Sequence, residues 1–334
     1  VGAGGAPPPR LPAEEALVLA EDRPLAVSRL FLYPIKSCAA FSVQRWALGP
    51  HGLLHDREWA IVGERGATLG CKTVPTLLRL RPALDLTRRT LVVEADGRAP
   101  LVLSLDHEPT PEEQLTFRVF GDSVEGHTYG AEADAWCSAV VGQAVRLVRK
   151  TGGVRECKQE KLRAGQAAMQ GSAAARQPEV GQTAIALANE SQLLLLNEGS
   201  LQDVRARVAA EQEQPGLLER SAIATEPLDV TVRRFRPNVV VTGAPAFHED
   251  TWERIFLAGI DCTCLGPCAR CAAICVHPDT GEKDVAKQPL ACLSTFRLVK
   301  NRVMFGRHVA YRLGAGEVAE VAVGQPLAVR SRFG

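Results

Sequence analysis

The sequence predicts a mixed α+β fold that is rich in β-strands. Short runs of β-branched, aromatic and leucine residues recur between turn-forming residues, whereas only two segments have a clear helical period. Strands and helices do not alternate regularly, which argues against a doubly wound parallel sheet. Apolar residues make up 46% of the 334 positions, so the chain can bury a substantial core.

The predicted elements fall into two β-rich parts, residues 24–150 and 183–332. Residues 1–23 are rich in Gly, Pro, Ala and Glu, and we expect a flexible linker there. Residues 151–182 are polar and have no strong apolar period, so we expect a mobile insertion or a joint between the two parts. Because the first residue is not methionine, we expect the chain to be either processed or cut from a longer protein.

The strands follow from local patterns. A first strand is predicted at 25–35, where an apolar run reaches Pro34. A hairpin is predicted at 89–105, because Asp96–Gly97 is a favourable tight-turn pair between two apolar runs. Further strands are predicted at 117–120, 230–232, 239–241 and 255–260.

Two helices are predicted. In residues 131–141, one face would carry Ala133, Trp136, Cys137, Val140 and Val141. In residues 200–208, Ser200 would be the N-cap, and the apolar stripe would consist of Leu201, Val204 and Val208.

Composition excludes several classes of protein. Lysine plus arginine, 39, nearly balances aspartate plus glutamate, 38, so net charge gives no reason to bind nucleic acid or an acidic membrane. No apolar run reaches the length of a membrane helix, and no signal peptide pattern opens the sequence. Glycine-rich phosphate loops and common hydrolase motifs are absent. We therefore expect no nucleic acid partner, no membrane contact and a cytosolic location.

The most unusual stretch is LGPCARCAAIC at 265–275. Its spacing is compatible with a zinc or iron–sulfur site, with a redox dithiol at Cys268 and Cys271, or with one metal-binding thiolate and Arg270 as an anion partner. Spacing does not decide among these chemistries. Cys275 is assigned to packing.

The other cysteines have a simpler interpretation. The sequence holds ten cysteines and no secretion signal, which indicates a reducing compartment and free thiols. Cys262 and Cys264 alternate on a predicted strand and are assigned to packing. Cys38, Cys137 and Cys292 are expected to be small buried apolar groups.

Four stretches, taken together, resemble the MOSC superfamily, whose members bind the molybdenum–pterin cofactor. They are LYPIKSCAAF at 32–41, HDREWAIV at 55–62, RFRPNVVVTG at 234–243 and CARCAAICVHPDTGE at 268–282. The first and last look most like the C-terminal domain of eukaryotic molybdenum cofactor sulfurases. The resemblance implies a β-rich MOSC fold, with an N-terminal β-rich subdomain at 24–150 and a β-barrel-like MOSC domain with a few helices at 183–332.

The resemblance also implies site residues. Cys271, the second cysteine of C-x-R-C, would be the catalytic thiolate that binds molybdenum, and Cys268 would be a second catalytic thiol or sulfur relay. The residues at cofactor-binding positions would be Lys36, Ser37, Arg57, Asn189, Ser191, Arg236, Asn238 and Arg270. Arginine and lysine suit a phosphate, and the asparagine amide suits a pterin edge. Arg233 and Arg234 are expected on an exposed strand face, outside the site.

The implied reaction is sulfur transfer, in which sulfane sulfur from a persulfide replaces an oxo ligand of molybdenum by sulfido. A pyridoxal-phosphate (PLP) cysteine desulfurase domain, fused or separate and absent from this chain, would supply the persulfide. Xanthine dehydrogenase and aldehyde oxidase would receive the sulfurated cofactor.

Two alternatives stay open. One is a molybdenum-dependent reductase of N-hydroxylated compounds, as in the related amidoxime-reducing proteins. The other is a structural zinc or iron–sulfur module.

Overall fold

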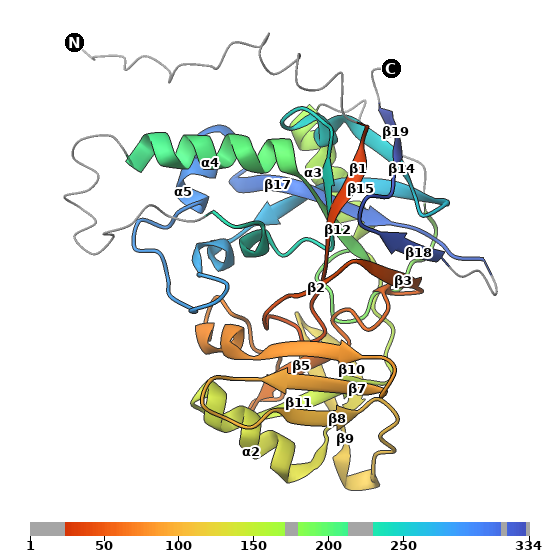
Figure 1. Ribbon diagram of the computed structural model, residues 1–334, viewed down its shortest axis with the longest axis vertical. Coiled ribbons are helices and arrows are strands. Elements are labelled where there is room, and N and C mark those ends of the chain that lie inside the picture. The colour runs from red at the N-terminus through yellow and green to blue at the C-terminus, as the bar shows by residue number, and fades with distance from the viewer. Residues whose placement is uncertain (1–23, 171–179, 213–229, 315–318, 332–334) are drawn as a thin grey trace.

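The computed structural model describes residues 24–170, 180–212, 230–314 and 319–331 (Figure 1). The fold is α+β and rich in strands, as the sequence predicts. Figure 1 shows two tiers, one with the largest sheet and helices α3, α4 and α5, the other with smaller sheets and α2. The four helices are α2 (Gly130–Val141), α3 (Gln159–Gln170), α4 (Glu198–Gln212) and α5 (Leu290–Phe296) within those ranges.

The largest sheet has nine strands in the order β19-β14-β15-β17-β12-β13-β1-β2, with β16 paired to β17. Only the pair β12–β13 is parallel within this sheet as described. The bounds are β1 (Ala26–Leu32), β2 (Phe41–Val43), β12 (Leu193–Asn197), β13 (Val239–Thr242), β14 (Trp252–Leu257), β15 (Ile260–Arg270), β16 (Leu298–Val299), β17 (Arg302–Ala310) and β19 (Ala328–Ser331).

Three smaller sheets complete the fold. Their orders are β5-β11-β10-β9, β6-β7-β8 and β18-β3-β4. The bounds are β3 (Arg45–Gly49), β4 (Gly52–Leu53), β5 (Trp59–Gly63), β6 (Arg81–Asp85), β7 (Thr90–Glu94), β8 (Leu101–Ser104), β9 (Gln114–Val119), β10 (Asp122–His127), β11 (Val145–Lys150) and β18 (Ala319–Ala322). Short 3-10 helices are η1 (Pro75–Arg79), η2 (Pro111–Glu113), η5 (Val232–Phe235), η6 (His248–Thr251) and η7 (Ala272–Cys275).

The first strands of the chain belong to sheets built mainly by its second half. β1 pairs with β13, and β3 pairs with β18. One hydrophobic cluster contains Leu91 and Cys137 from the lower tier together with Val309 and Trp252 from the upper tier. The first half of the chain therefore contributes strands to sheets that the second half completes, and the two tiers share one hydrophobic core. The division at 24–150 and 183–332 stays a prediction about the sequence, and the linker predicted at 1–23 lies outside the described residues.

Several local predictions are confirmed. The hairpin predicted at 89–105 is β7–β8, the first strand is β1, and the segments at 117–120 and 239–241 fall largely in β9 and β13. The strand predicted at 255–260 ends at Leu257, and a turn leads into β15. The helix predicted at 131–141 is α2, with Ala133, Cys137 and Val141 buried.

Helix α4 forms where predicted, but its cap differs. Leu201, Val204 and Val208 are buried as expected. The helix begins at Glu198, and Asn197 Oδ1 accepts from the Gly199 amide at 3.1 Å, so Asn197 rather than Ser200 caps it. Ser200 lies inside the first turn and donates to the buried carboxyl of Glu249 at 2.6 Å.

One predicted strand is wrong, and one helix was not predicted. A strand was expected at 230–232, yet Val232 begins η5, which ends where Arg236 adopts a left-handed backbone. Within 151–182, where we expect a mobile insertion or a joint, residues 159–170 form α3, which packs on β15 through Leu162. Apolar periodicity missed α3 because its second buried side chain is Gln166, a polar residue that accepts a hydrogen bond from Arg307.

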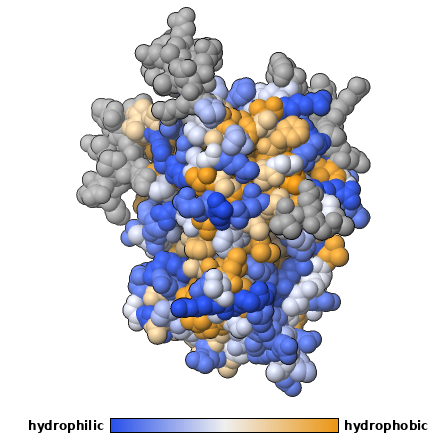
Figure 2. All heavy atoms as spheres, turned by 45° about the vertical axis from the view of Figure 1, so that its right-hand side comes forward, coloured by the Kyte–Doolittle hydropathy of each residue, from blue (hydrophilic) through white to orange (hydrophobic). Residues whose placement is uncertain are grey.

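The surface agrees with the balanced composition. On the face in Figure 2, hydrophobic residues are interspersed with hydrophilic ones. Among the described helices, none is long and apolar enough to cross a membrane.

Candidate functional site

One cavity brings together residues from distant parts of the chain. It has a volume of about 180 Å³, and the loop after β1, the 188–191 loop before β12, η5 and the end of β15 contribute to it. Every residue that the sequence nominates for catalysis or cofactor binding lines it: Lys36, Ser37, Arg57, Asn189, Ser191, Arg236, Asn238, Cys268, Arg270 and Cys271. Their chemical roles stay predictions.

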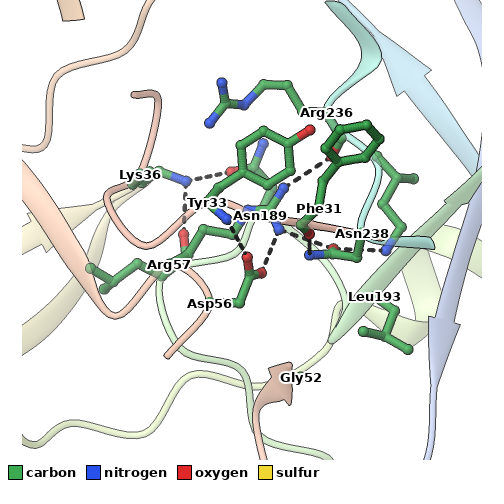
Figure 3. Close-up of polar contacts among 12 residues, drawn as sticks. Phe31, Tyr33, Lys36, Gly52, Asp56, Arg57, Asn189, Leu193, Arg236 and Asn238 are labelled. Atoms are coloured by element: carbon green, nitrogen blue, oxygen red, sulfur yellow. Dashed lines mark hydrogen bonds and ion pairs between the residues drawn. The ribbon is translucent and has the colours of Figure 1, made fainter. Parts of the chain in front are cut away.

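Lys36 is a buried lysine with no carboxylate at ion-pair distance in the described part of the chain. Its Nζ donates to the Leu187 carbonyl at 2.8 Å and to Asn189 Oδ1 at 2.5 Å (Figure 3). Burial, reinforced by neighbouring arginines, lowers the Lys36 pKa well below its ordinary value. An anion in the cavity would oppose both effects and favour the charged ammonium.

Tyr33 fixes the position of two arginines. The guanidinium carbons of Arg57 and Arg236 lie 4.4 and 4.3 Å from the centre of its ring. Figure 3 shows the ring between Lys36, Arg57 and Arg236 in the middle of the polar network. Burial raises the Tyr33 pKa to about 12, so the phenol is neutral and its ring can stack against cations.

Arg57 is bound within the protein. It forms an ion pair with Asp56, whose side chain is 2% exposed. Its Nη1 also donates to Asn238 Oδ1 at 3.0 Å, and its Nη2 donates to the Arg236 carbonyl at 3.1 Å. The charge of Arg57 is thus largely balanced by Asp56, and its role includes holding the segment that carries Arg236.

Asn238, directly before β13, links strands β12 and β1 to this network. Its Oδ1 accepts from the Leu194 amide at 3.2 Å as well as from Arg57, and its Nδ2 donates to the Phe31 carbonyl at 3.3 Å (Figure 3). Both lone pairs of the amide oxygen are therefore used inside the protein. Asn238 positions Arg57, and only the second Nδ2 hydrogen is left for a ligand.

Three candidate residues have a strained backbone. Ser37, Arg57 and Arg236 adopt φ values of 68°, 49° and 55°. Non-glycine residues rarely take these values, and each costs about 1–3 kcal/mol. The surrounding contacts, such as the Arg57 bond to the Arg236 carbonyl, hold this conformation.

Arg236 and Arg270 each keep a buried Nη2 without a hydrogen-bond partner among the described residues. The other nitrogens are engaged. Arg236 Nη1 donates to the Cys38 carbonyl at 2.8 Å, and Arg270 donates to the carbonyls of Phe305 and Phe235 at 2.7 and 2.8 Å. Because a buried N–H without an acceptor is costly, these two atoms indicate an acceptor that comes from a ligand.

Gly306 makes room for Arg270. A Cβ at this position would lie 2.8 Å from Arg270 Nη2 and 3.0 Å from the Leu195 carbonyl. Its φ of 77° also favours glycine. The close approach of β17 to the guanidinium therefore depends on the missing side chain.

Three cysteines line the cavity, Cys71, Cys268 and Cys271, and the two that the sequence nominates lie in different environments. Cys271 is exposed, whereas Cys268 is buried on β15. Burial alone would raise the pKa of the Cys268 thiol, but the charges of Arg270 and His308 outweigh it, and its pKa falls below 9.0. His308 is buried on β17 beside the thiol, and its Nε2 lies 3.2 Å from Glu190 Oε2.

The cysteines that the sequence assigns to packing are buried. They are Cys38, Cys137, Cys262, Cys264, Cys275 and Cys292, all of them free thiols. Cys275 Sγ donates to the Lys287 carbonyl at 3.2 Å. Within the described ranges, no three His, Cys, Asp or Glu side chains are arranged to hold a metal ion.

Sequence analysis did not nominate four other titratable residues that line the cavity, His308, Glu190, Arg234 and Cys71. Arg234, expected on an exposed strand face, lies in η5 and is 4% exposed, so that prediction is wrong. A signal did exist for His308. It lies in the otherwise apolar segment VMFGRHVAY at 303–311, where a buried polar side chain requires a partner.

Comparison with known proteins agrees with this geometry. Residues 25–144 match the MOSC N-terminal beta barrel domain, and residues 182–328 match the MOSC domain. Molybdenum cofactor sulfurase from Bos taurus is 31% identical over 258 residues, which are 77% of this chain and 27% of the bovine protein. The Homo sapiens protein is 32% identical, over 82% of this chain and 29% of its own length. The Oryza sativa protein is 33% identical, with shares of 83% and 31%.

This chain spans less than a third of the length of those three relatives. Among solved structures, a solution structure from Bordetella bronchiseptica aligns with 31% of this chain and 88% of its own length, at 22% identity and a TM-score of 0.25. That likeness is too weak to support an argument.

Proposed function

The chain belongs to the MOSC family, and we propose that its cavity binds the molybdenum–pterin cofactor as substrate and takes part in its sulfuration. The observation that carries this proposal is a cation-rich cavity in which Arg236 and Arg270 keep buried, unpartnered nitrogens, and which the thiols of Cys268 and Cys271 also line. The names of the relatives, molybdenum cofactor sulfurases, support sulfur transfer as the reaction.

The charge of the cavity suits an anionic ligand. Arg57 is paired with Asp56 and His308 with Glu190, which leaves Lys36, Arg236 and Arg270 without an acidic partner in the described chain. A phosphate is bound well by guanidinium groups through paired hydrogen bonds and by an ammonium through its charge. We assign the phosphate of the cofactor to these three cations.

Cys271 is the residue we assign to molybdenum. Its thiol is exposed at the cavity, and a thiolate is a soft ligand that suits this metal.

When bound, the molybdenum centre provides the position at which an oxygen ligand is exchanged for sulfur. The exchange takes the outer sulfur of a persulfide, two electrons and two protons, and it releases the donor thiol and water. A dithiol is the class of reductant that we include for the two electrons. We further propose that the persulfide comes from a PLP-dependent cysteine desulfurase, and that xanthine dehydrogenase and aldehyde oxidase receive the product.

Binding to the purified chain tests this function. Arg236→Gln and Lys36→Met should each weaken retention of the cofactor about tenfold or more, because a hydrogen bond to a charged group contributes about 1.5–3 kcal/mol. The measurement is the pterin that stays with the protein after equilibrium dialysis, assayed by fluorescence after oxidation.

The matched control is Arg45→Gln, because Arg45 is 73% exposed and pairs with Glu320 at the surface, away from the cavity. Its affinity should equal that of the unmodified chain. A chain that retains no pterin, or two cavity variants that retain as much as the control, would contradict the proposed function.

A further inference from the structure

Three elements bring Cys268, His308 and Glu190 to one wall of the cavity. Cys268 lies on β15 and His308 on the neighbouring β17, where Gly266 pairs with His308 and the register shifts between Pro267 and Ala269. Glu190 comes from the loop before β12. All three side chains line the cavity.

The contacts of His308 favour its charged form. Ser191 Oγ lies 2.8 Å from the Leu193 carbonyl and 2.7 Å from His308 Nδ1, and when its proton goes to the carbonyl it accepts from Nδ1. The other ring nitrogen, Nε2, lies 3.2 Å from the Glu190 carboxylate, at ion-pair distance. Protons on both ring nitrogens suit this arrangement, so we assign His308 as an imidazolium.

The pKa values agree with this assignment. Burial alone would lower the His308 pKa, but contact with Cys268 and Glu190 raises it to about 9. The pKa of Glu190 falls to about 2, because His308 and Lys161 outweigh the effect of its burial. The charged groups that face Cys268 are thus Arg270 and His308, both cationic, and Glu190, which is anionic.

Cys268 differs in this respect from its neighbours on the same strand. Burial raises the pKa of Cys262 to about 12 and that of Cys264 to about 11, so both stay protonated thiols. Cys268 is equally enclosed but faces two cations and a cavity. A thiolate in such a place is a nucleophile rather than a packing group.

We propose that Cys268 accepts sulfane sulfur from a persulfide as a cavity-facing thiolate, with His308 and Glu190 as the positioning pair that holds it in the reactive state. This inference rests on the proposed function, since it names the residue of this chain that carries sulfur before the sulfur reaches molybdenum. Under this proposal Cys268 transfers sulfur, whereas Cys271 binds the metal.

The step is balanced without a further reactant. The Cys268 thiolate attacks the outer sulfur of the donor R–S–SH, a new S–S bond forms at Cys268 Sγ, and the S–S bond of the donor breaks. Its electron pair leaves on the inner sulfur as R–S⁻, and the hydrogen stays on the outer sulfur. The products are Cys268–S–SH and the donor thiolate, which can take a proton from the His308 imidazolium beside Cys268.

The first test measures thiol reactivity in the chain without cofactor. The alkylation rate of Cys268 by iodoacetamide, followed by peptide mass spectrometry from pH 5 to 10, should report a pKa below that of an ordinary thiol. His308→Gln should raise that pKa and slow alkylation at pH 7 about tenfold, which corresponds to about one pKa unit.

The matched control is His107→Gln. His107 Nε2 also pairs with a glutamate, Glu113, at 3.0 Å, but this pair does not line the cavity. In the His107→Gln variant, the pH dependence of Cys268 alkylation should match that of the unmodified chain. An equal shift in both variants would assign the effect to the fold and overturn the inference.

The second test loads sulfur onto the same chain, with glutathione persulfide as the probe. Trypsin cleavage after Arg270 places Cys268 and Cys271 on different peptides. Mass spectrometry can therefore assign the added sulfur to one peptide or the other, and fragmentation of that peptide assigns it to a cysteine. The sulfur should appear on Cys268, be lost in Cys268→Ser and fall about tenfold in His308→Gln.

Sulfur on Cys271 alone, or equal loading of Cys268 with and without His308, would overturn the inference. If His308→Gln does not fold, Glu190→Gln and the pH profile of the unmodified chain test the same pair. Because neither assay contains cofactor, a failure here is distinguishable from a failure of pterin retention, which would contradict the proposed function instead.

Discussion

At the scale of single residues, the cavity contains two kinds of arginine. Arg57 has a buried carboxylate partner and bonds to Asn238 and to the Arg236 carbonyl. Arg236 and Arg270 have no such partner in the described chain and keep an unsatisfied nitrogen. The first kind maintains the geometry of the site, and the second kind is available to a ligand, although all three were nominated together from sequence.

This difference predicts that substitutions of Arg57 and Arg236 lower the stability of the protein by different amounts. Arg57→Gln should lower the free energy of unfolding by about 3–5 kcal/mol, because it leaves the buried carboxylate of Asp56 without its cation. Arg236→Gln removes no ion pair and should cost much less, while it weakens cofactor binding. Urea unfolding of the two variants without cofactor measures this difference.

A second change provides the control for Arg57. In Arg57→Gln, an added Asp56→Asn should recover part of the lost stability, because it removes the unpaired charge but keeps an acceptor for the Tyr33 amide, which donates to Asp56 Oδ1 at 2.8 Å. If Arg57→Gln and Arg236→Gln unfold at the same urea concentration, Arg57 has no special structural role.

At the scale of elements, α3 and β15 lie so close together that one added methyl group can prevent their contact. A Cβ on Gly266 of β15 would lie 2.3 Å from the Leu162 carbonyl of α3, a distance that no folded backbone accepts. A Cβ on Gly165 of α3 would lie 3.7 Å from Pro267, which is ordinary contact. β15 continues from there to Cys268, so this interface supports one wall of the cavity.

Two alanine substitutions on this interface should therefore act in opposite directions. Gly266→Ala should destabilise the protein by more than about 1–3 kcal/mol, the usual cost of overpacking, because backbone rather than a side-chain end must move. Gly165→Ala should stabilise it by about 0.5–1 kcal/mol, since alanine favours a helix interior. Thermal melts of both variants check the signs, and a neutral Gly266→Ala would contradict the close contact.

Sequence patterns reveal elements that bury an apolar stripe. Helices α2 and α4 were predicted because their buried positions repeat with the helical period. Helix α3 was missed because polar contacts hold its inner face, among them the bond from Arg307 to Gln166. Local pattern also placed a strand at 230–232, where tertiary contacts instead support η5 and the left-handed Arg236.

The candidate site was predictable only in part, for a related reason. Motifs nominated ten residues that do line one cavity, but they could not show that Asp56 balances Arg57 or that His308 lies beside Cys268. These pairs depend on strand register and on contacts between segments far apart in the chain, such as β15 with β17. Short motifs carry no information about such pairing.

At the scale of the whole molecule, the two tiers are interlocked. β1 and β3 come early in the chain, yet they pair with β13 and β18, and one hydrophobic cluster extends through both tiers. Unfolding one tier would remove part of the hydrophobic core that the other packs against. We therefore expect a single cooperative transition, although chains of this length often unfold in steps.

A buried carboxyl in the upper tier makes that cooperativity measurable. Glu249 is 1% exposed in η6, and its carboxyl accepts from Ser200 Oγ at 2.6 Å and from Asn197 Nδ2 at 3.0 Å, which links η6 to the start of α4. Burial, with Asp250 nearby, raises its pKa to about 7 from an ordinary value of 4.5.

The pKa of Glu249 is higher in the folded than in the unfolded state, so between pH 4.5 and 7 the folded state binds more protons. Its contribution, about 3 kcal/mol, is complete below pH 4.5 and is lost as the pH rises through about 7. Glu249→Gln stays neutral, so it should remove this pH dependence and raise Tm at pH 8, whereas Glu94→Gln at an exposed position should not. If the tiers are one cooperative unit, calorimetry should show one peak that moves with pH as a whole. Two peaks, only one of which changes its temperature with pH, would mean that the tiers unfold separately despite their shared core.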